Sequence, residues 1–276
     1  MKTKQHRMKN LFLFLFLLVV FTSKAQDNRV SGLNSRQFTK YWKVESESPD
    51  YKVTFQGDTA EIVSPKGLTL WRKEKMSGKV TIEYDACVVV ESDGDRLSDL
   101  NCFWMASDPQ YPDNLWKREK WRSGIFLNCY SLQLYYLGYG GNHNSTTRFR
   151  RYDGDESGIT NPKARPAILK EYTDAGHLLK PNHWYHIKIT NENNRVSYYI
   201  DGERLVDFRD AEPLREGWFG FRTTLSRTRI TNFSYECSSQ EATAVPLQWI
   251  GETPRQDKAV SFGVPFDKGE VFPENK

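Results

Sequence analysis

The densest group of charged and hydrogen-bonding side chains in the sequence lies between residues 135 and 152. Asn142 and His143 follow a Gly-rich stretch, where the chain can turn sharply and approach a ligand closely. Residues two apart in a strand point to the same face, so we expect Arg148 and Arg150 to lie side by side. A guanidinium holds a carboxylate through two parallel hydrogen bonds. We therefore predict that Asn142, Arg148 and Arg150 bind an anionic sugar.

The same residue types could perform β-elimination on a uronate-containing polysaccharide. That reaction needs a cation or hydrogen-bond donor to stabilise the charge that builds on the carboxylate. It also needs a base that removes a proton and an acid that protonates the leaving oxygen. We predict that His143, Tyr152 and Tyr139 supply these catalytic groups.

A purely structural interpretation of this segment stays open beside the functional one. Gly-Gly-Asn is common in surface loops, and an Arg-rich strand is often a solvated edge. Asp153, Asp155 and Glu156 follow directly and are suitable ion-pair partners for the arginines.

Three further residues are candidates for substrate binding. Alternation along residues 217–224 places Phe219 and Phe221 in the core, which leaves Arg222 on the opposite face. Trp104 and Arg122 come before the Gly-rich segment and could frame the same groove, because tryptophan faces pack well on the C–H surfaces of sugars.

The elements that must position these residues are predicted to be strands. Residues 80–90 alternate apolar and polar side chains over their whole length, and Asp201-Gly202 is a two-residue hairpin signal. We predict an all-β sandwich of two antiparallel sheets. The expected strands are residues 52–55, 61–63, 68–72, 80–90, 101–106, 124–129, 132–137, 183–190, 195–200, 203–207, 217–224 and 228–236.

The order of the last strands resembles a known fold family. Trp184-Tyr185-x-Ile187-x-Ile189 is followed by Tyr199-Ile200-Asp201-Gly202, then by Gly217-x-x-Gly220-Phe221-Arg222 and Ile230-x-Asn232-Phe233. This succession is similar to the concanavalin A-like lectin/glucanase jelly roll, and is closest to uncharacterised bacterial families near the 3-keto-disaccharide hydrolases. The resemblance implies a jelly-roll sandwich with one hollow sheet face. It leaves activity undecided, because the fold hosts hydrolases, lyases and lectins.

Two functions other than elimination follow from this resemblance. Hydrolysis usually requires a pair of carboxylates at a set separation. The E-x-D-x-x-E strand motif of the glucanase members is absent, since Glu83 and Asp85 have no third acid at the required spacing. The other alternative is a non-catalytic carbohydrate-binding module, in which the same groove residues would contact the ligand.

Cofactor and disulfide predictions are limited. No nucleotide-binding or zinc-ligand motif appears, and we expect no cofactor. Asp93-Gly94-Asp95 and Asp153-Gly154-Asp155 could supply oxygen ligands to a structural calcium ion, but neither matches an EF-hand loop, so we interpret both as turns. The four cysteines allow three disulfide pairings or buried free thiols.

The first residues have the pattern of an export signal. Four basic residues precede an apolar run from Leu11 to Phe21, and small residues around Ala25 form a cleavage site. The run is too short for a transmembrane helix. We expect a signal peptide over residues 1–25, a linker over 26–37 and a periplasmic or secreted protein with no membrane association after cleavage. Export and a mature charge near neutral disfavour nucleic acid as a partner.

The C-terminal residues predict the start of another domain. Residues 247–254 and 261–266 contain apolar positions in alternation and a Gly-x-Pro turn. They resemble the entry to the N-terminal β-barrel of exo-acting rhamnogalacturonan lyases. We therefore expect the sandwich over residues 38–237, followed over 238–276 by a linker and the beginning of a truncated or split lyase-type domain. This placement favours a polysaccharide ligand and a downstream lyase domain as partners.

Overall fold

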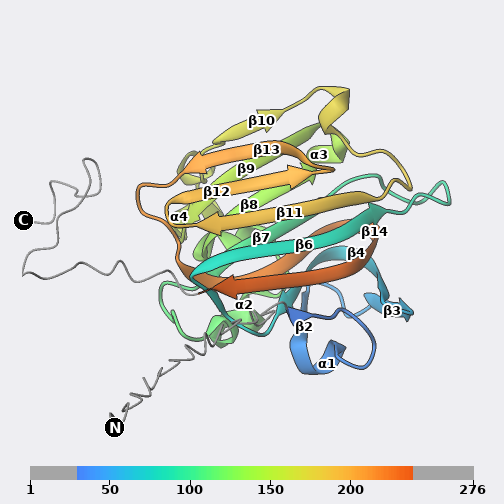
Figure 1. Cartoon of the computed structure of the whole chain (residues 1–276), viewed down its shortest axis with the longest axis horizontal. Helices are drawn as coiled ribbons and strands as arrows, with labels where there is room; N and C mark the ends of the chain where they lie inside the picture. Colours follow the sequence, from blue (N-terminus) through green and yellow to red (C-terminus); the bar gives the residue numbers. More distant parts are fainter. Residues whose placement is uncertain (1–29, 239–276) are drawn as a thin grey trace, which may run out of the picture.

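Strand β14 (Glu216–Ser238) belongs to both sheets of the fold and connects them (Figure 1). The computed structural model describes residues 30–238. The first part of β14 pairs with β7, and the second part pairs with β6, both antiparallel. β4 (Thr59–Arg72) runs along both parts, and its register with β14 shifts between Thr224 and Ser226. Leu225, at this bulge, has a φ of 49°, so the strand bends here from one sheet into the other.

One sheet, here called the β8 sheet, carries the Arg-rich segment. Its strands follow in the order β10-β9-β8-β7-β14, and β4 and β2 continue it beyond β14. The bounds of its members other than β4 and β14 are Lys170–Tyr172 for β10, Thr146–Asp153 for β9, Gln133–Gly140 for β8, Leu100–Ser107 for β7 and Trp42–Ser46 for β2.

The other sheet, here called the β11 sheet, lies in front of the β8 sheet in the view of Figure 1. Its strands follow in the order β13-β12-β11-β6-β14, with β4 and β3 beyond. Their bounds are Glu203–Arg209 for β13, Arg195–Ile200 for β12, Tyr185–Glu192 for β11, Lys79–Val88 for β6 and Lys52–Gln56 for β3. Two short strands, β1 (Val30–Ser31) and β5 (Met76–Ser77), also pair with β14.

The main core fills the space between the two sheets. Inward-facing side chains alternate with outward-facing ones along each strand, as the period of two predicts. Trp104 of β7 packs against Tyr198 of β12 with ring centroids 6.1 Å apart, and Tyr84 of β6 lies 5.9 Å from Phe219 of β14. These aromatic contacts join the sheets.

A second apolar cluster lies on the outer face of the β8 sheet. There, the segment of residues 108–132, here called the cover segment, packs Leu115, Cys129 and Tyr130 onto Phe103 and Trp218 of the sheet. The cover segment contains η1 (Leu115–Arg118), α2 (Glu119–Arg122) and η2 (Leu127–Ser131), and the remaining short helices are α1 (Phe38–Tyr41), α3 (Gly141–Asn144), α4 (Ser157–Thr160), η3 (Pro162–Ala164) and η4 (Ala175–His177). Part of the outer face is therefore covered and part is left open.

The predicted all-β sandwich is confirmed, with some differences in its elements. Residues 61–63 and 68–72 form one continuous strand, and so do residues 217–224 and 228–236, because each runs through a bulge without interruption. The strand expected over 124–129 is wrong: this stretch enters the 3₁₀ helix η2 within the cover segment. Its apolar side chains pack onto the sheet from outside instead of pairing as a strand.

The domain boundaries stay predictions. β1 pairs with Tyr235 of β14 although it lies in the expected linker. The expected signal peptide and nearly all of the C-terminal extension lie outside the described residues. Within the part of the chain that the structure describes, no helix has the length and apolar character needed to cross a bilayer.

Candidate functional site

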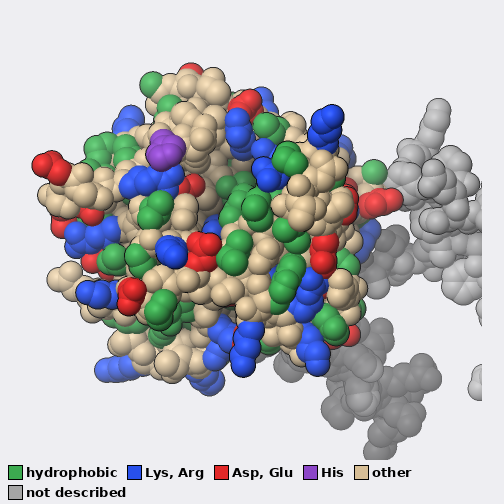
Figure 2. All heavy atoms as spheres, turned by 180° about the vertical axis from the view of Figure 1, so that it is seen from behind, with side chains coloured by type: hydrophobic (Ala, Val, Ile, Leu, Met, Phe, Trp, Pro, Cys, Tyr) green, Lys and Arg blue, Asp and Glu red, His purple; other side chains and the backbone are tan. Residues whose placement is uncertain are grey.

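The uncovered part of the outer face of the β8 sheet contains a cavity of about 470 Å³, here called the β8 cavity. Figure 2, which views the molecule from behind Figure 1, shows this face hollowed near its middle, with hydrophobic and basic side chains around the hollow. The lining residues are Glu47, Arg96, Asp99, Asn101, Ile125, Phe126, Leu127, Tyr130, Tyr136, Gly138, Gly141, Asn142, Thr146, Arg148, Arg150, Tyr152, Arg222 and Thr224.

The floor of the cavity consists of outward-facing positions on four adjacent strands. Tyr136 and Gly138 of β8 lie opposite Arg150 and Arg148 of β9 in the strand register, and Asn101 of β7 pairs with Gly138 on the other side. A Cβ atom at Gly138 would overlap the phenol of Tyr136. The glycine therefore keeps the floor open beside the aromatic ring.

The cover segment forms one wall of the cavity and is fixed to the floor. Phe126 packs on Tyr136 with ring centroids 5.6 Å apart, and Tyr130 packs on Tyr152 at 5.2 Å. Arg222 is only 3% exposed, and its NH1 group donates to the carbonyl of Gly124 at 2.6 Å. Arg222 therefore both lines the cavity and holds its aromatic wall in place.

The turn of residues 142–144, here called the Asn-His turn, forms another wall of the β8 cavity. Asn142, His143 and Asn144 all adopt left-handed backbone angles, which Asn tolerates better than most residues. Asn144 compensates for this conformation, since its side chain accepts from the amide of Leu179 at 2.8 Å and donates to the Leu179 carbonyl at 2.9 Å. Asn142 lines the cavity, whereas the exposed His143 lies outside its lining.

The arginines of β9 reach the cavity with different partners. Arg148 pairs through Nε with Glu171 of β10 at 2.5 Å. Arg150 donates through NH1 to the carbonyl of Pro166. Among residues 30–238, Arg150 forms no ion pair with a carboxylate, so its hydrogen-bond partner there is a neutral carbonyl oxygen and no protein anion neutralises its charge. Arg151 points to the other face and binds Asp210 at 2.7 Å, which agrees with the expected alternation.

A second polar group reaches the cavity from the start of β7. Asp99 has a φ of 65° and is only 8% exposed. Its carboxylate accepts hydrogen bonds from Arg96 at 2.7 Å, from Ser98 at 2.9 Å and from Asn101 at 3.2 Å. Glu47, on the opposite side, accepts from the amide of Gly67 at 2.7 Å.

Sequence reasoning missed Glu47, Arg96, Asp99 and Asn101. Asn101 was within reach of sequence reasoning, because the period of two places it on the same strand face as Phe103. Glu47 could not be found in this way, since it follows a strand distant in sequence and no local pattern connects it to the Arg-rich segment.

Two of the residues predicted to bind substrate lie outside the cavity because they are buried. Trp104 is inaccessible between the sheets, since Phe103 takes the outward-facing position of β7. Arg122 is also inaccessible, and its NH2 group donates to Glu45 at 3.0 Å and to the Leu115 carbonyl at 2.6 Å. Arg122 thus stabilises the cover segment from beneath and presents no group to a ligand.

The tyrosines predicted to act in catalysis are buried as well. Tyr139 faces the main core, where its hydroxyl donates to the Leu178 carbonyl at 3.3 Å. Tyr152 belongs to the lining of the cavity but is inaccessible, and its buried hydroxyl has no hydrogen-bond partner among the described residues. Burial raises the pKa of Tyr139 and of Tyr152 well above the ordinary value. Both phenols therefore stay protonated near neutral pH and are unsuited to removing a proton.

The cysteines and Asp-Gly-Asp sequences have structural roles in the described residues. All four cysteines are free thiols, and burial raises the pKa of Cys102 and of Cys129 to about 12. Asp95 accepts from two backbone amides of its own turn, and Asp155 accepts from Ser157. Within residues 30–238, no group of three or more His, Cys, Asp or Glu side chains is placed to hold a metal ion.

Solved structures similar to this chain share its fold at low sequence identity. A protein of unknown function with a galectin-like fold from Bacillus subtilis is 16% identical with a TM-score of 0.60, over 77% of this chain and 96% of that chain. The VIP36 exoplasmic/lumenal domain in a Ca²⁺/Man3GlcNAc-bound form is 9% identical with a TM-score of 0.52, over 79% and 91%. The Emp47p carbohydrate recognition domain is 14% identical with a TM-score of 0.51, over 77% and 96%.

These likenesses establish a lectin-type jelly roll and leave the ligand open. The finer resemblance to families near the 3-keto-disaccharide hydrolases, and that of the C-terminal residues to rhamnogalacturonan lyases, stay predictions. No curated protein matches the chain in sequence. A family model does match over residues 62–233, more than half of the chain, and covers most strands of both sheets. The chain therefore belongs to the family described as Domain of unknown function (DUF6250).

Proposed function

We propose that this domain binds a saccharide in the β8 cavity. The observation that carries the proposal is that aromatic rings and side-chain amides line one cavity whose volume suits a small ligand. Phe126, Tyr130 and Tyr136 offer apolar faces to a sugar ring, while Asn101 and Asn142 offer amides to its hydroxyl groups. Ligand cavities of about 300–1,000 Å³ are usual for small ligands, and this one lies within that range.

Structural neighbours support a saccharide as the ligand class. They include the Emp47p carbohydrate recognition domain and the VIP36 exoplasmic/lumenal domain in its Ca²⁺/Man3GlcNAc-bound form. Because these neighbours are less than a fifth identical to this chain, they support the class of ligand and leave its identity to the residues of the cavity.

The charges of the cavity favour an acidic saccharide. Four guanidinium groups line it, against the two carboxylates of Glu47 and Asp99. Asp99 is bound by Arg96, and Arg148 is bound by Glu171 outside the lining. The charge of Arg150 is left without a carboxylate partner in the described part of the chain, so a ligand carboxylate could complete the pair.

Binding without cleavage agrees best with the positions of the candidate catalytic groups. Elimination needs a base within hydrogen-bonding reach of the reacting carbon. Within the described residues, neither histidine nor lysine lines the cavity, and the hydroxyl of Tyr152 is buried and kept protonated. We therefore propose a non-catalytic carbohydrate-binding module in preference to a lyase.

Glycoside hydrolysis is a second candidate because two carboxylates line the same cavity. Asp99 already accepts three side-chain hydrogen bonds, which leaves Glu47 as the more available acid. A hydrolase would need both groups, one as an acid and the other as a base or nucleophile.

The expected leader and the C-terminal extension give this binding role a context. A protein exported from the cell would meet extracellular polysaccharides, and a binding domain placed before a lyase-type domain would hold the polymer for that domain. Both parts of this context are proposals: the leader rests on the residue pattern of the first 25 residues, and the lyase-type domain rests on the resemblance of the C-terminal residues.

Affinity electrophoresis of the protein in gels containing polygalacturonate, alginate or neutral dextran tests the proposal. We expect retardation by the acidic polymers and little by dextran. The same mixtures, followed by absorbance near 235 nm and by a reducing-sugar assay, separate binding from reaction. A rise at 235 nm would establish elimination, new reducing ends without that absorbance would establish hydrolysis, and the absence of retardation by every glycan would refute the proposed function.

A further inference from the structure

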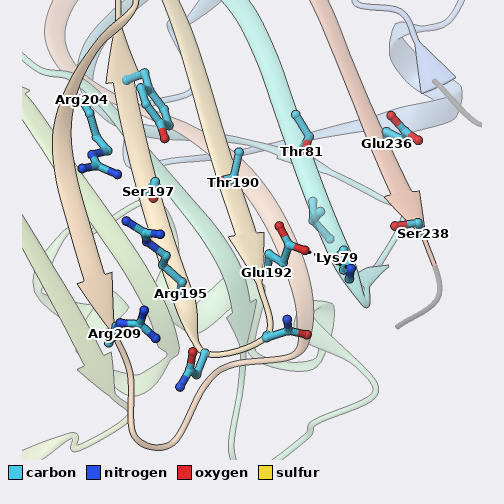
Figure 3. Close-up of a pocket in the computed structure, with 14 residues that line it drawn as sticks. Lys79, Thr81, Thr190, Glu192, Arg195, Ser197, Arg204, Arg209, Glu236 and Ser238 are labelled. Carbon is cyan, nitrogen blue, oxygen red and sulfur yellow. Dashed lines mark ion pairs between the residues drawn. The ribbon is translucent and has the colours of Figure 1, made fainter. Parts of the chain in front are cut away.

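A second cavity, of about 610 Å³, here called the β11 cavity, lies on the outer face of the β11 sheet (Figure 3). The β8 cavity lies on the outer face of the other sheet. The side chains of the β11 cavity come from β14, β6, β11, β12 and β13 and from the turn between β11 and β12. They are Lys79, Val80, Thr81, Thr190, Glu192, Asn193, Asn194, Arg195, Ser197, Tyr199, Arg204, Arg209, Glu236 and Ser238.

The β11 cavity extends across the strands. Five neighbouring strands contribute to it, and adjacent strands in a sheet lie about 4.8 Å apart, so it extends over about 19 Å. This length suits a segment of an extended polymer better than a single compact ligand.

Positive charge is concentrated at the β13 side of the cavity. Arg195 binds Asp207 through two nitrogen atoms at 2.6 Å and 2.7 Å, and Arg204 binds the same carboxylate at 3.2 Å. The hydrogen bonds from Arg195, with added effects of the charges on Arg204 and Arg209, lower the pKa of Asp207. Asp207 therefore pairs with two guanidinium groups, and the charge of a third also acts on it.

Arg209 is the least satisfied of these cations. It lies directly opposite Arg195 in the register of β12 and β13, and like charges in this position repel each other. Among residues 30–238, Arg209 forms no ion pair of its own. Figure 3 shows Arg195, Arg204 and Arg209 gathered at one side of the cavity, where an added anion would relieve their repulsion.

The rest of the cavity is nearly neutral and rich in hydrogen-bonding groups. Lys79 is paired with Glu192 at 2.9 Å, and Glu236 lies toward the opposite side from the arginines (Figure 3). Between these groups, the hydroxyl side chains of Thr81 and Thr190 can donate to and accept from the hydroxyl groups of a sugar chain.

We propose that the β11 cavity is a second binding site, which takes an extended polysaccharide carrying spaced carboxylate or sulfate groups. One anionic group would sit among the three arginines, and the neutral part of the chain would cross β11 and β6. Double-stranded DNA carries a charge about every 1.7 Å, so it would bring phosphates against Glu192 and Glu236. The proposal goes beyond the β8 cavity, because it assigns a function to a separate surface.

The test uses the double variant R204Q/R209Q, which removes two charges at exposed positions and keeps the Arg195–Asp207 pair. Lys188→Gln is the matched control, because Lys188 lies on the same sheet face, outside both cavities, and also pairs with a carboxylate. Titrations with polygalacturonate and with chondroitin sulfate separate carboxylate from sulfate recognition. A DNA duplex of equal total charge tests for unspecific polyanion binding.

We expect R204Q/R209Q to weaken binding of at least one acidic polysaccharide about five- to tenfold, and K188Q to leave it unchanged. Circular dichroism melting curves confirm that both variants are folded. Binding of both acidic polymers by R204Q/R209Q as tightly as by the wild type would overturn the proposal, and so would equally tight binding of the DNA duplex. These titrations are made in an Arg150→Ala background, which weakens the β8 cavity, and Arg150→Ala alone decides that cavity, so either site can fail while the other stands.

Discussion

Replacing Arg150 with alanine is expected to weaken binding of acidic saccharides and to spare binding of neutral ones. Arg150 is half-buried on the floor of the β8 cavity and donates only to the carbonyl of Pro166. A hydrogen bond to a charged group contributes about 1.5–3 kcal/mol, and about 1.4 kcal/mol corresponds to a tenfold change in affinity. The variant should therefore bind a galacturonate oligosaccharide about 10- to 100-fold more weakly.

Isothermal titration calorimetry with galacturonate and galactose oligosaccharides of equal length measures this difference. Lys188→Gln serves as the control for a lost surface charge outside both cavities. Because Arg150 has a neutral protein partner, we expect the melting temperature of the variant to stay within a few degrees of the wild type. Equal loss of affinity for acidic and neutral oligosaccharides, or no loss for either, would refute the reasoning.

Three further predictions concern the surroundings of the cavity. Asn144→Ala removes both hydrogen bonds to Leu179. The saccharide affinity measured by titration should therefore fall about three- to tenfold, while most of the thermal stability remains. An unchanged affinity would show that the Asn-His turn is not part of the site. Trp104→Ala should destabilise the domain by about 3–5 kcal/mol in urea unfolding, because Trp104 lies between the sheets. At urea concentrations below the unfolding transition, the saccharide affinity of this variant should equal that of the wild type. With Ellman's reagent at pH 8, the half-buried Cys237 should react before Cys102, whose pKa burial raises to about 12, and rapid modification of Cys102 in the folded protein would contradict the core.

The fold was predictable because it depends on short-range periodicity. The alternation over residues 80–90 and the hairpin at Asp201-Gly202 define strand faces and turns without knowledge of distant partners. The same alternation places Arg148 and Arg150 on one face, and both line the cavity in the structure. Their role in binding stays a prediction.

The cover segment marks the limit of this reasoning. Residues 108–132 have no regular period, and their apolar side chains pack on the outside of a sheet, where a polar face is the usual expectation. For this reason, the strand expected over 124–129 was wrong, and the side chain of Arg122, a residue of this segment that was predicted to bind substrate, lies buried. Strand parity would have removed Trp104 from the candidates, since Asn101 and Phe103 occupy the other face of β7.

The cavity itself combines residues that no local pattern connects. Glu47 follows β2, Asp99 precedes β7 and Arg222 comes from β14, so their proximity depends on the order of strands in the β8 sheet. Sequence reasoning identified the Arg-rich part of the cavity lining and could not identify its acidic part.

A crystal structure of the domain with a bound galacturonate oligosaccharide tests the central claim most directly. The proposed function predicts a sugar ring in the β8 cavity against Phe126 or Tyr136, with its carboxylate hydrogen-bonded to Arg150. Ordered sugar found only outside the β8 cavity would contradict it.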